Sequence, residues 1–333
     1  MSRPLVMVTG GAGFIGSNVV ADLLAQGDCD VAVCDRLRSA ASGKWRNLAK
    51  HAIADFVAPE ALFTWLGAHA REVSAVVHMA AISSTTEPDA DLILHSNFTL
   101  SRALWDWAAE AGVKLVYASS AATYGDGALG FEDDDDFAAL ARLRPLNPYG
   151  WSKALFDLYA RRQADAGRAP PSWAGLKFFN VYGPNEYHKG AMQSVAAKAW
   201  PEVRDGGGVS LFRSHHPEFA DGGQLRDFVY VKDASAVVAW LVGQDGLAGV
   251  YNLGSGAARS FKDLAAAVFA AAGRPPQIAY VDTPEAIRAQ YQYFTEAPMQ
   301  RLRTLGYSAP FADLQTGVAD YVANYLSKAD PYR

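Results

Sequence analysis

Cysteines and long apolar runs are scarce in this sequence, and each shortage excludes a class of protein. Its 333 residues include two cysteines, Cys29 and Cys34, which are too few for a disulfide framework and too isolated for a metal site. We therefore expect free thiols and a cytoplasmic location. No uncharged run approaches the roughly 20 residues of a membrane-spanning helix. The first apolar run stops at Thr9, so a secretory signal is not expected either.

A strong positive charge is also missing. The formal net charge is −5, which provides no basic field for a nucleic-acid backbone, so we expect no nucleic-acid partner. His215 and His216 are adjacent in a polar stretch without nearby metal-binding partners, and we predict no metal site. The four carboxylates at 133–136 repel one another, which predicts a solvated loop.

Short apolar runs alternate with longer helical patterns along most of the chain. The runs are rich in β-branched residues and cover residues 5–9, 31–35, 75–81, 115–120 and 176–183. This rhythm is typical of βαβ units and a parallel sheet. Because the runs are almost continuously apolar, the strands should be covered by helices on both faces. We predict an α/β fold with a Rossmann-type, doubly wound parallel sheet.

A second, smaller domain is expected towards the C-terminus. From about Pro184 the pattern loosens, and Gly- and Pro-rich stretches interrupt shorter elements. Two later strand-like runs, RDFVYV at 226–231 and GVYNLGSG at 249–256, are predicted to belong to the first domain again. We therefore predict a first domain over 1–183 with these two runs, and a discontinuous substrate domain over 184–225 and 257–333.

The glycines between the first strand and the first helix predict a dinucleotide site. Gly10, Gly13 and Gly16 follow a strand ending at Thr9 and precede a helix starting near Ile15. Glycine allows a tight turn and close approach of a pyrophosphate, and the helix N-terminus favours an anion. Asp35 ends the second strand, where an acid meets the adenosine ribose.

A second pattern predicts acid–base chemistry. Tyr149 and Lys153 are four residues apart and so share one face of a helix. A nearby ammonium and a positively charged nicotinamide would favour the phenolate of Tyr149, which makes it a candidate base. Ser119 and Ser120 end a strand at the carboxyl edge of the sheet, where either hydroxyl can hold a reacting oxygen.

These motifs resemble the extended short-chain dehydrogenase/reductases that act on nucleotide sugars. The matching stretches are TGGAGFIG, HMAA, YASSAATYG, YGWSK and FFNVYGP. Further stretches, SSTTE, FNVYGPNEYHKGAM and RDFVYV among them, are similar to the branch of that family that epimerises carbon 6 of an ADP-linked heptose, a precursor of the lipopolysaccharide core. This resemblance spans nearly the whole chain.

The resemblance implies roles for individual residues. It makes Ser120, Tyr149 and Lys153 the catalytic trio and Lys189 a second acid or base. It assigns a cofactor to Gly10, Gly13, Phe14, Ile15, Gly16, Asp35, Arg36, Lys44, Met79, Ala80, Ala81, Ser83, Asn97, Tyr149, Lys153 and Val181. It assigns a nucleotide sugar, ADP-heptose, to Ser83, Ser120, Asn180, Ala191, Lys198, Phe212, Arg226 and Tyr291. It also implies a homo-oligomer.

The sequence departs from the branch pattern at two places. Lys198 stands where the branch has His, and the segment 213–225 is longer than usual, which leaves the contacts to the nucleotide open there. The cofactor is expected to be NADP, with NAD as a weaker substitute. Asp35 would repel a 2′-phosphate, but Arg36, Arg38 and Lys44 follow in the same loop and can neutralise that charge.

Other functions compete with the heptose epimerase. A UDP-hexose 4-epimerase remains open, whereas a 4,6-dehydratase needs an Asp-Glu pair where this chain has Ala121 and Ala122. A cofactor-sensing protein without catalysis would be expected to have lost Tyr149 or Lys153, and both are present.

Overall fold

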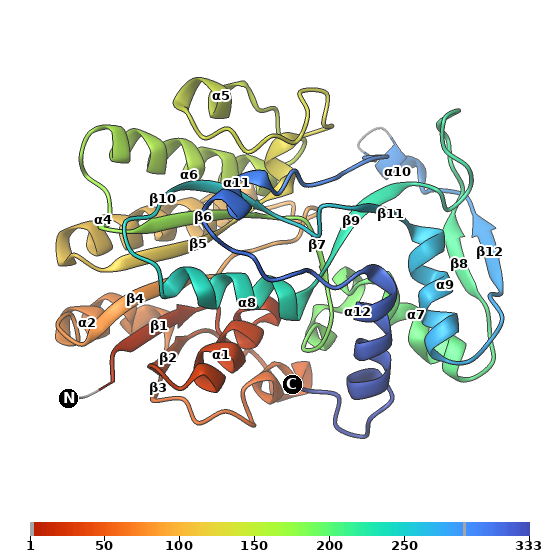
Figure 1. The fold of residues 1–333 in the computed structure, drawn as a ribbon, viewed down its shortest axis with the longest axis horizontal. Coiled ribbons are helices and arrows are strands. Elements are labelled where there is room, and N and C mark those ends of the chain that lie inside the picture. The colour runs from red at the N-terminus through yellow and green to blue at the C-terminus, as the bar shows by residue number, and fades with distance from the viewer. Residues whose placement is uncertain (1–2, 289–290) are drawn as a thin grey trace. The chain divides into compact units, whose positions relative to one another are not determined.

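The chain folds into two compact units. The computed structural model describes residues 3–288 and 291–333 (Figure 1). The first unit contains the chain up to Gly125 together with Asp133–Phe178 and Ser235–Tyr251. The second contains Asp126–Glu132, Phe179–Ala234 and Asn252–Arg333.

A seven-stranded sheet forms the centre of the first unit. Its strand order is β10-β6-β5-β4-β1-β2-β3, and the pairs from β6 to β3 are parallel. The strands are β1 (Leu5–Thr9), β2 (Asp30–Cys34), β3 (Asp55–Val57), β4 (Val73–His78), β5 (Lys114–Ser120), β6 (Trp173–Phe178) and β10 (Ala248–Leu253). The order reverses between β1 and β4, where doubly wound sheets bind ligands. The predicted Rossmann-type sheet is confirmed.

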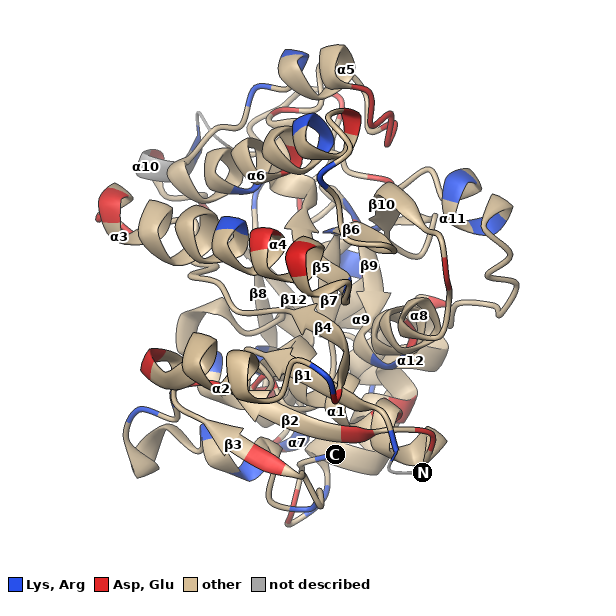
Figure 2. Cartoon of the chain, turned by 90° about the vertical axis from the view of Figure 1, so that its left-hand side faces the viewer, with Lys and Arg blue, Asp and Glu red and all other residues tan. Residues whose placement is uncertain are grey.

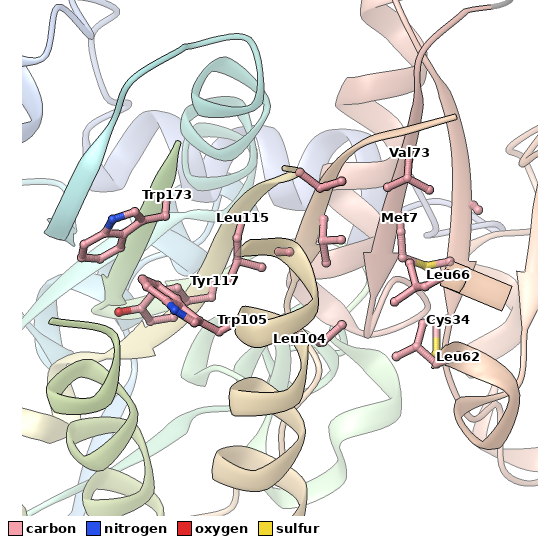
Figure 3. Close-up of a cluster of buried hydrophobic side chains, with 14 of the residues drawn as sticks. Met7, Cys34, Leu62, Leu66, Val73, Leu104, Trp105, Leu115, Tyr117 and Trp173 are labelled. Atoms are coloured by element: carbon pink, nitrogen blue, oxygen red, sulfur yellow. The ribbon is translucent and has the colours of Figure 1, made fainter. Parts of the chain in front are cut away.

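Helices cover both faces of this sheet, and its strands are therefore buried on both sides. On one face α2 (Leu62–Ala68), α4 (Leu100–Ala111) and α6 (Pro148–Asp165) pack against alternate strand residues. Figure 3 shows part of this core, in which Trp105 of α4 packs edge-on against Trp173 of β6. On the other face lie α1 (Phe14–Gln26) and α8 (Val231–Val242) (Figure 1).

The second unit contains two small sheets. One has the order β11-β9-β7 and the other pairs β12 with β8. Its strands are β7 (Asn180–Tyr182), β8 (Val209–Phe212), β9 (Leu225–Tyr230), β11 (Ala258–Ser260) and β12 (Ile278–Val281). Its helices are α7 (Val195–Arg204), α9 (Phe261–Ala271), α10 (Glu285–Arg288), α11 (Gln300–Thr304) and α12 (Leu314–Tyr321). The first unit also contains α3 (Ala90–Leu94) and α5 (Phe137–Arg142).

Three local expectations differ from the structure. The run 176–183 is not one strand, because the chain leaves the large sheet after Phe178 and β7 pairs with β9 instead. Likewise β9, which the sequence placed with the first domain, lies in the second unit. Asp133 is buried, and Asp135 accepts a hydrogen bond from the Val250 N–H, so the acidic run is only partly solvated. Apolar pattern does not specify the pairing partner of a strand.

Cys29 and Cys34 are both free, as expected, and both are buried. No helix among residues 3–288 and 291–333 is long and apolar enough to cross a membrane. Within the same residues, no group of three or more His, Cys, Asp or Glu side chains is arranged to hold a metal ion. Figure 2 shows Asp and Glu on α3, on α4 and in the loop before α5, with Lys and Arg on many other elements.

Candidate active site

The loop between β1 and α1 is shaped by its glycines. Gly10 has a left-handed φ of 70°, and a Cβ there would lie 2.6 Å from the backbone nitrogen of Ala80. A Cβ on Gly16 would lie 2.2 Å from the Gly10 carbonyl oxygen. Gly13 caps α1 without any side-chain hydrogen bond, and Phe14 and Ile15 begin its first turn. The structure therefore has a bare turn that fits a diphosphate at a helix N-terminus.

Replacing Gly16 with alanine should weaken cofactor binding. The new methyl group would displace the Gly10 carbonyl, at an expected cost of about 1–3 kcal/mol. If the loop loses its shape, the cofactor Kd rises by about 10- to 100-fold. A fluorescence titration with the cofactor measures this change. Gly67→Ala in α2 is the matched control, because no atom lies within 4 Å of its Cβ position apart from its chain neighbours and the backbone of its own helix. An unchanged Kd in the Gly16 variant would contradict the assignment of this loop.

Asp35 follows β2 and lies beside the glycine loop. Its Oδ2 accepts a hydrogen bond from the Ala12 N–H at 2.9 Å, which fixes the carboxylate against the loop. Its Oδ1 accepts from the Lys44 ammonium and from the Arg36 N–H, both at 2.6 Å. The guanidinium of Arg36 is exposed and pairs with Glu60. Of the cations in this loop, Lys44 is therefore the one held against Asp35.

The segment after β4 lies on the other side of the strand reversal. Met79, Ala80 and Ala81 follow His78, and Met79 N–H donates to the Thr9 carbonyl at 2.9 Å. These residues and Ser83 are half-buried or exposed. The backbone after β4 therefore passes directly along the glycine loop, as a cofactor-binding edge requires.

Asn97 connects this segment to the helix that carries Tyr149 and Lys153. It lies in a π-helical turn, His95–Thr99, a distortion that often marks functional sites. Its carboxamide accepts from the Ile82 N–H at 2.8 Å and donates to the Ile82 carbonyl and to Ser152 Oγ. Ser152 Oγ donates to the Tyr149 carbonyl at 2.7 Å. The contacts of Asn97 are thus to protein groups that align the strand end with α6.

Ser120, Tyr149 and Lys153 come together at the carboxyl end of β5. Asn147 caps α6 by accepting from the Gly150 N–H at 2.8 Å, which starts the helix just before Tyr149. Burial raises the pKa of the Tyr149 phenol, and its hydrogen bond with Ser120 opposes that effect. Burial lowers the pKa of Lys153 to about 8, while Asp157 raises it. Lys153 Nζ donates to the Ala118 carbonyl at 2.8 Å.

Lys189 lies in the second unit, in a short turn over Tyr187–Met192. Burial lowers the pKa of its amine, and Lys198 adds to this effect whereas Glu186 opposes it. Glu186 is fully buried and accepts hydrogen bonds from the N–H and hydroxyl of Ser194 and from the Tyr321 hydroxyl. The hydrogen bonds from Ser194 to the buried carboxylate of Glu186 therefore hold the segment that carries Lys189. Lys198 is exposed and donates to the Ala191 carbonyl.

Three residues of the second unit that are expected to contact the nucleotide lie together: Arg226, Tyr291 and Phe212. Arg226 is buried in β9, and its guanidinium donates to the carbonyls of Leu225 and Gln292. It lies over the ring of Tyr291 at 5.4 Å, and Phe212 packs edge-on against the same ring. Burial lowers the pKa of Arg226.

The remaining predicted residues of the second unit lie on β7. Asn180 is exposed and Val181 is half-buried, and both pair with β9. The long segment 213–225 turns back on itself, with Phe219 and His216 against the ring of Tyr293. This contact brings the long segment next to Tyr291, which stacks edge-on against Tyr293.

Comparison with known proteins places this architecture in a family. Residues 6–254 match the NAD dependent epimerase/dehydratase family. The chain belongs to this family. Family membership confirms an enzyme fold of the predicted kind and a nicotinamide cofactor, for which the glycine loop and Asp35 provide a fitting cradle.

Full-length relatives of the epimerase/dehydratase family are closely similar to this chain. ADP-L-glycero-D-manno-heptose-6-epimerase of Nitratidesulfovibrio vulgaris (strain DP4) is 50% identical over 330 residues, which cover 98% of this chain and all of the relative. The crystal structure of the Helicobacter pylori enzyme of the same name has a TM-score of 0.78 at 26% identity, over 97% of this chain and 96% of that one. Thermus thermophilus UDP-glucose 4-epimerase, solved with NAD, has a TM-score of 0.74 at 31% identity, over 96% and 97%.

Sequence reasoning missed three buried charged residues of this epimerase/dehydratase fold. Asp157 and Lys177 form an ion pair behind Ser120 and Lys153, and Glu186 fixes the segment of Lys189. Asp157 could have been noticed, because it lies four residues after Lys153 on the same helix face. Lys177, within an otherwise apolar strand, and Glu186 carried no comparable signal.

Proposed function

We propose that the chain inverts carbon 6 of the heptose in ADP-D-glycero-D-manno-heptose and so forms ADP-L-glycero-D-manno-heptose. The observation that carries this proposal is the 50% identity to a relative of that name along its entire length. The similarity includes the second unit, in which members with different substrates are expected to differ most. A UDP-hexose 4-epimerase is the alternative, supported by the likeness to the Thermus thermophilus enzyme.

A direct comparison of substrates tests the proposal. The purified protein is offered ADP-D-glycero-D-manno-heptose and, separately, UDP-galactose, and the products are examined by NMR for a new diastereomer. Inversion of the heptose is expected. Conversion of UDP-galactose without conversion of the heptose would replace the proposal with the alternative.

The chemistry requires an oxidation because carbon 6 lies on an exocyclic arm and has no neighbouring carbonyl to acidify its hydrogen. The nicotinamide cofactor, when bound, supplies reversible hydride storage. Tyr149 takes the proton of the substrate hydroxyl, and its positive surroundings with the cofactor present favour the phenolate. Ser120, which is hydrogen-bonded to Tyr149, holds the same oxygen. Lys153 supplies positive charge from the next turn of α6.

Inversion at carbon 6 requires the 6-keto arm to rotate before the hydride returns. The rotation carries the ketone oxygen away from the group that first took its proton, so a second proton donor is needed. We assign this role to Lys189. Support comes from its half-buried amine, whose pKa burial lowers, so the ammonium gives up its proton more readily than that of an exposed lysine. In this scheme most residues assigned to the cofactor belong to the first unit, and most residues assigned to the nucleotide sugar belong to the second.

We propose NADP as the preferred cofactor and NAD as a weaker substitute. Lys44 offsets the charge of Asp35, which would otherwise repel a 2′-phosphate. Lys44→Ala should therefore weaken NADP binding by about 10- to 100-fold, the range for a lost charge-assisted hydrogen bond, and leave NAD binding nearly unchanged. Fluorescence titrations with both cofactors measure this. A wild-type protein that binds NAD more tightly than NADP would contradict the proposal.

We also propose that the protein is a homo-oligomer. Trp151 of α6 and Leu92 of α3 are 49% and 44% exposed, although both are large and apolar, and aromatic residues such as Trp are enriched at protein–protein interfaces. Analytical ultracentrifugation over a range of concentrations tests this point, and a monomer at every concentration would contradict it.

A further inference from the structure

A buried ion pair lies behind the predicted catalytic residues of the first unit. Asp157 of α6 and Lys177 of β6 have side chains that are 0% and 1% exposed, and Lys177 Nζ lies 2.9 Å from Asp157 Oδ2. Removing two charges from water is costly, so a buried pair of this kind needs further hydrogen bonds to be tolerated. The partners that satisfy it are therefore informative.

The partners of the pair lie on both sides of Ser120. Asp157 accepts hydrogen bonds from the hydroxyls of Ser119, at 2.7 Å, and Tyr117, at 3.1 Å. Lys177 Nζ donates to Thr123 Oγ1 at 2.7 Å, and Thr123 Oγ1 donates to the Ser120 carbonyl at 2.8 Å. The pair thus holds the residue before Ser120 and the turn after it. Two separate branches fix the position of Ser120 relative to α6.

The same carboxylate also acts on Lys153. Tyr149, Lys153 and Asp157 follow one another at intervals of four residues, so they share one face of α6. Asp157 raises the pKa of Lys153 against the larger effect of burial. Two further titratable groups lie near Lys153. The first is Tyr149, one turn earlier on the same face of α6. The second is His78 at the end of β4, whose pKa burial lowers to about 3, so it stays neutral over the working range. Asp157 is therefore the acid that favours the charged form of Lys153.

We infer that Asp157 and Lys177 are positioning residues, which hold Ser120 in register with α6 and keep Lys153 protonated, without touching the substrate. This inference rests on the catalytic roles proposed above for Ser120 and Lys153. The pair then contributes to the reaction as well as to packing, because removal of the Asp157 carboxylate would lower the protonated fraction of Lys153.

The charge of Lys153 can be followed without any substrate. Protein labelled with ¹³C at lysine Cε is titrated by NMR, and the Lys153 signal is identified by its absence from Lys153→Met. The wild-type midpoint is expected at about 8. In Asp157→Asn it should be lower by about one pH unit or more, because an opposite charge nearby has been removed. An unchanged midpoint in a folded Asp157→Asn protein would overturn the inference.

Asp106→Asn is the matched control. Asp106 of α4 hydrogen-bonds the Tyr159 hydroxyl and so also contacts α6, but it lies outside the network around Ser120. This variant should keep the wild-type midpoint. If the single Asp157 variant does not fold, Asp157→Asn combined with Lys177→Gln retains a neutral hydrogen-bonding pair, and a smaller lowering of the Lys153 midpoint is expected, because loss of the Lys177 cation partly offsets loss of the carboxylate. An unchanged midpoint in that double variant would equally overturn the inference.

Turnover gives a second readout with a distinctive pH dependence. A midpoint lowered from 8 to 7 reduces the protonated fraction of Lys153 at pH 8 from about one half to about one tenth. Loss of the Lys153 proton should therefore reduce the turnover of Asp157→Asn about fivefold at pH 8, in addition to any structural defect. At pH 6.5 this additional reduction should be much smaller, because Lys153 is mostly protonated in both proteins. A loss equal at both pH values would contradict the role in protonation. If the wild type does not convert the heptose, the proposed function fails, whereas the NMR comparison still decides this inference.

Discussion

Tyr149→Phe is expected to lose turnover by about 10²–10⁴-fold, the usual contribution of a positioned acid or base. The phenylalanine ring keeps the packing of the half-buried side chain but cannot take the hydroxyl proton of the substrate. Cofactor binding should stay nearly unchanged, because the phosphates and ribose are assigned to the glycine loop and to Asp35. Steady-state kinetics with the ADP-heptose and a fluorescence titration with the cofactor measure the two quantities separately.

Tyr159→Phe is the control for this experiment. Tyr159 lies on the same helix, and its hydroxyl bonds Asp106 rather than Ser120, so turnover should stay close to that of the wild type. Lys153→Ala differs from both variants, since the ammonium is expected to serve the cofactor ribose and the phenolate, and both binding and turnover should fall. If Tyr149→Phe loses cofactor binding together with activity, Tyr149 is structural and another base must be sought.

Lys189→Ala should lose turnover by a similar factor, about 10²–10⁴-fold, while it still binds cofactor and substrate. The variant leaves Tyr149 as the only base, and the rotated ketone oxygen then lacks its proton donor. Lys262→Ala, which removes an exposed lysine of α9 in the same unit, should be fully active. A fully active Lys189→Ala would favour the alternative in which a whole sugar ring turns and returns its oxygen to Tyr149.

Turnover in deuterated water tests the same scheme from the side of the substrate. The hydrogen of carbon 6 leaves and returns as a hydride that does not exchange with solvent, so mass spectrometry should find no deuterium on that carbon. Deuterium at carbon 6 would show that a proton is removed instead, and it would exclude the hydride cycle whichever residue acts as the second donor.

Local sequence motifs predicted those parts of the candidate site in which residues close in the sequence also lie close together in the structure. Gly10, Gly16 and the following helix form one continuous turn, and their spacing is specific enough to indicate a dinucleotide cradle. The same holds for Tyr149 and Lys153, which are related by helix geometry. The sheet could be predicted as well, because strands buried on both faces leave a plain apolar signature.

Contacts between distant parts of the chain could not be predicted in this way. Lys177 looks misplaced in an apolar strand until its partner Asp157, on the preceding helix, is known. The single apolar run 176–183 gave no sign that β6 and β7 join different sheets. Individual site roles, including those of Lys189 and Arg226, stay predictions until the variants are measured.

The late position of β10 affects how the protein can be synthesised. Trp173, at the start of β6, donates its N–H to the carbonyl of Leu247, and β10 then completes that side of the sheet. While the ribosome makes residues 179–247, β6 is an open edge of buried, apolar residues, which is a template for mispairing with other chains. A nascent or truncated chain that ends before Ala248 should therefore aggregate or depend on chaperones, although its glycine loop and α6 are already complete.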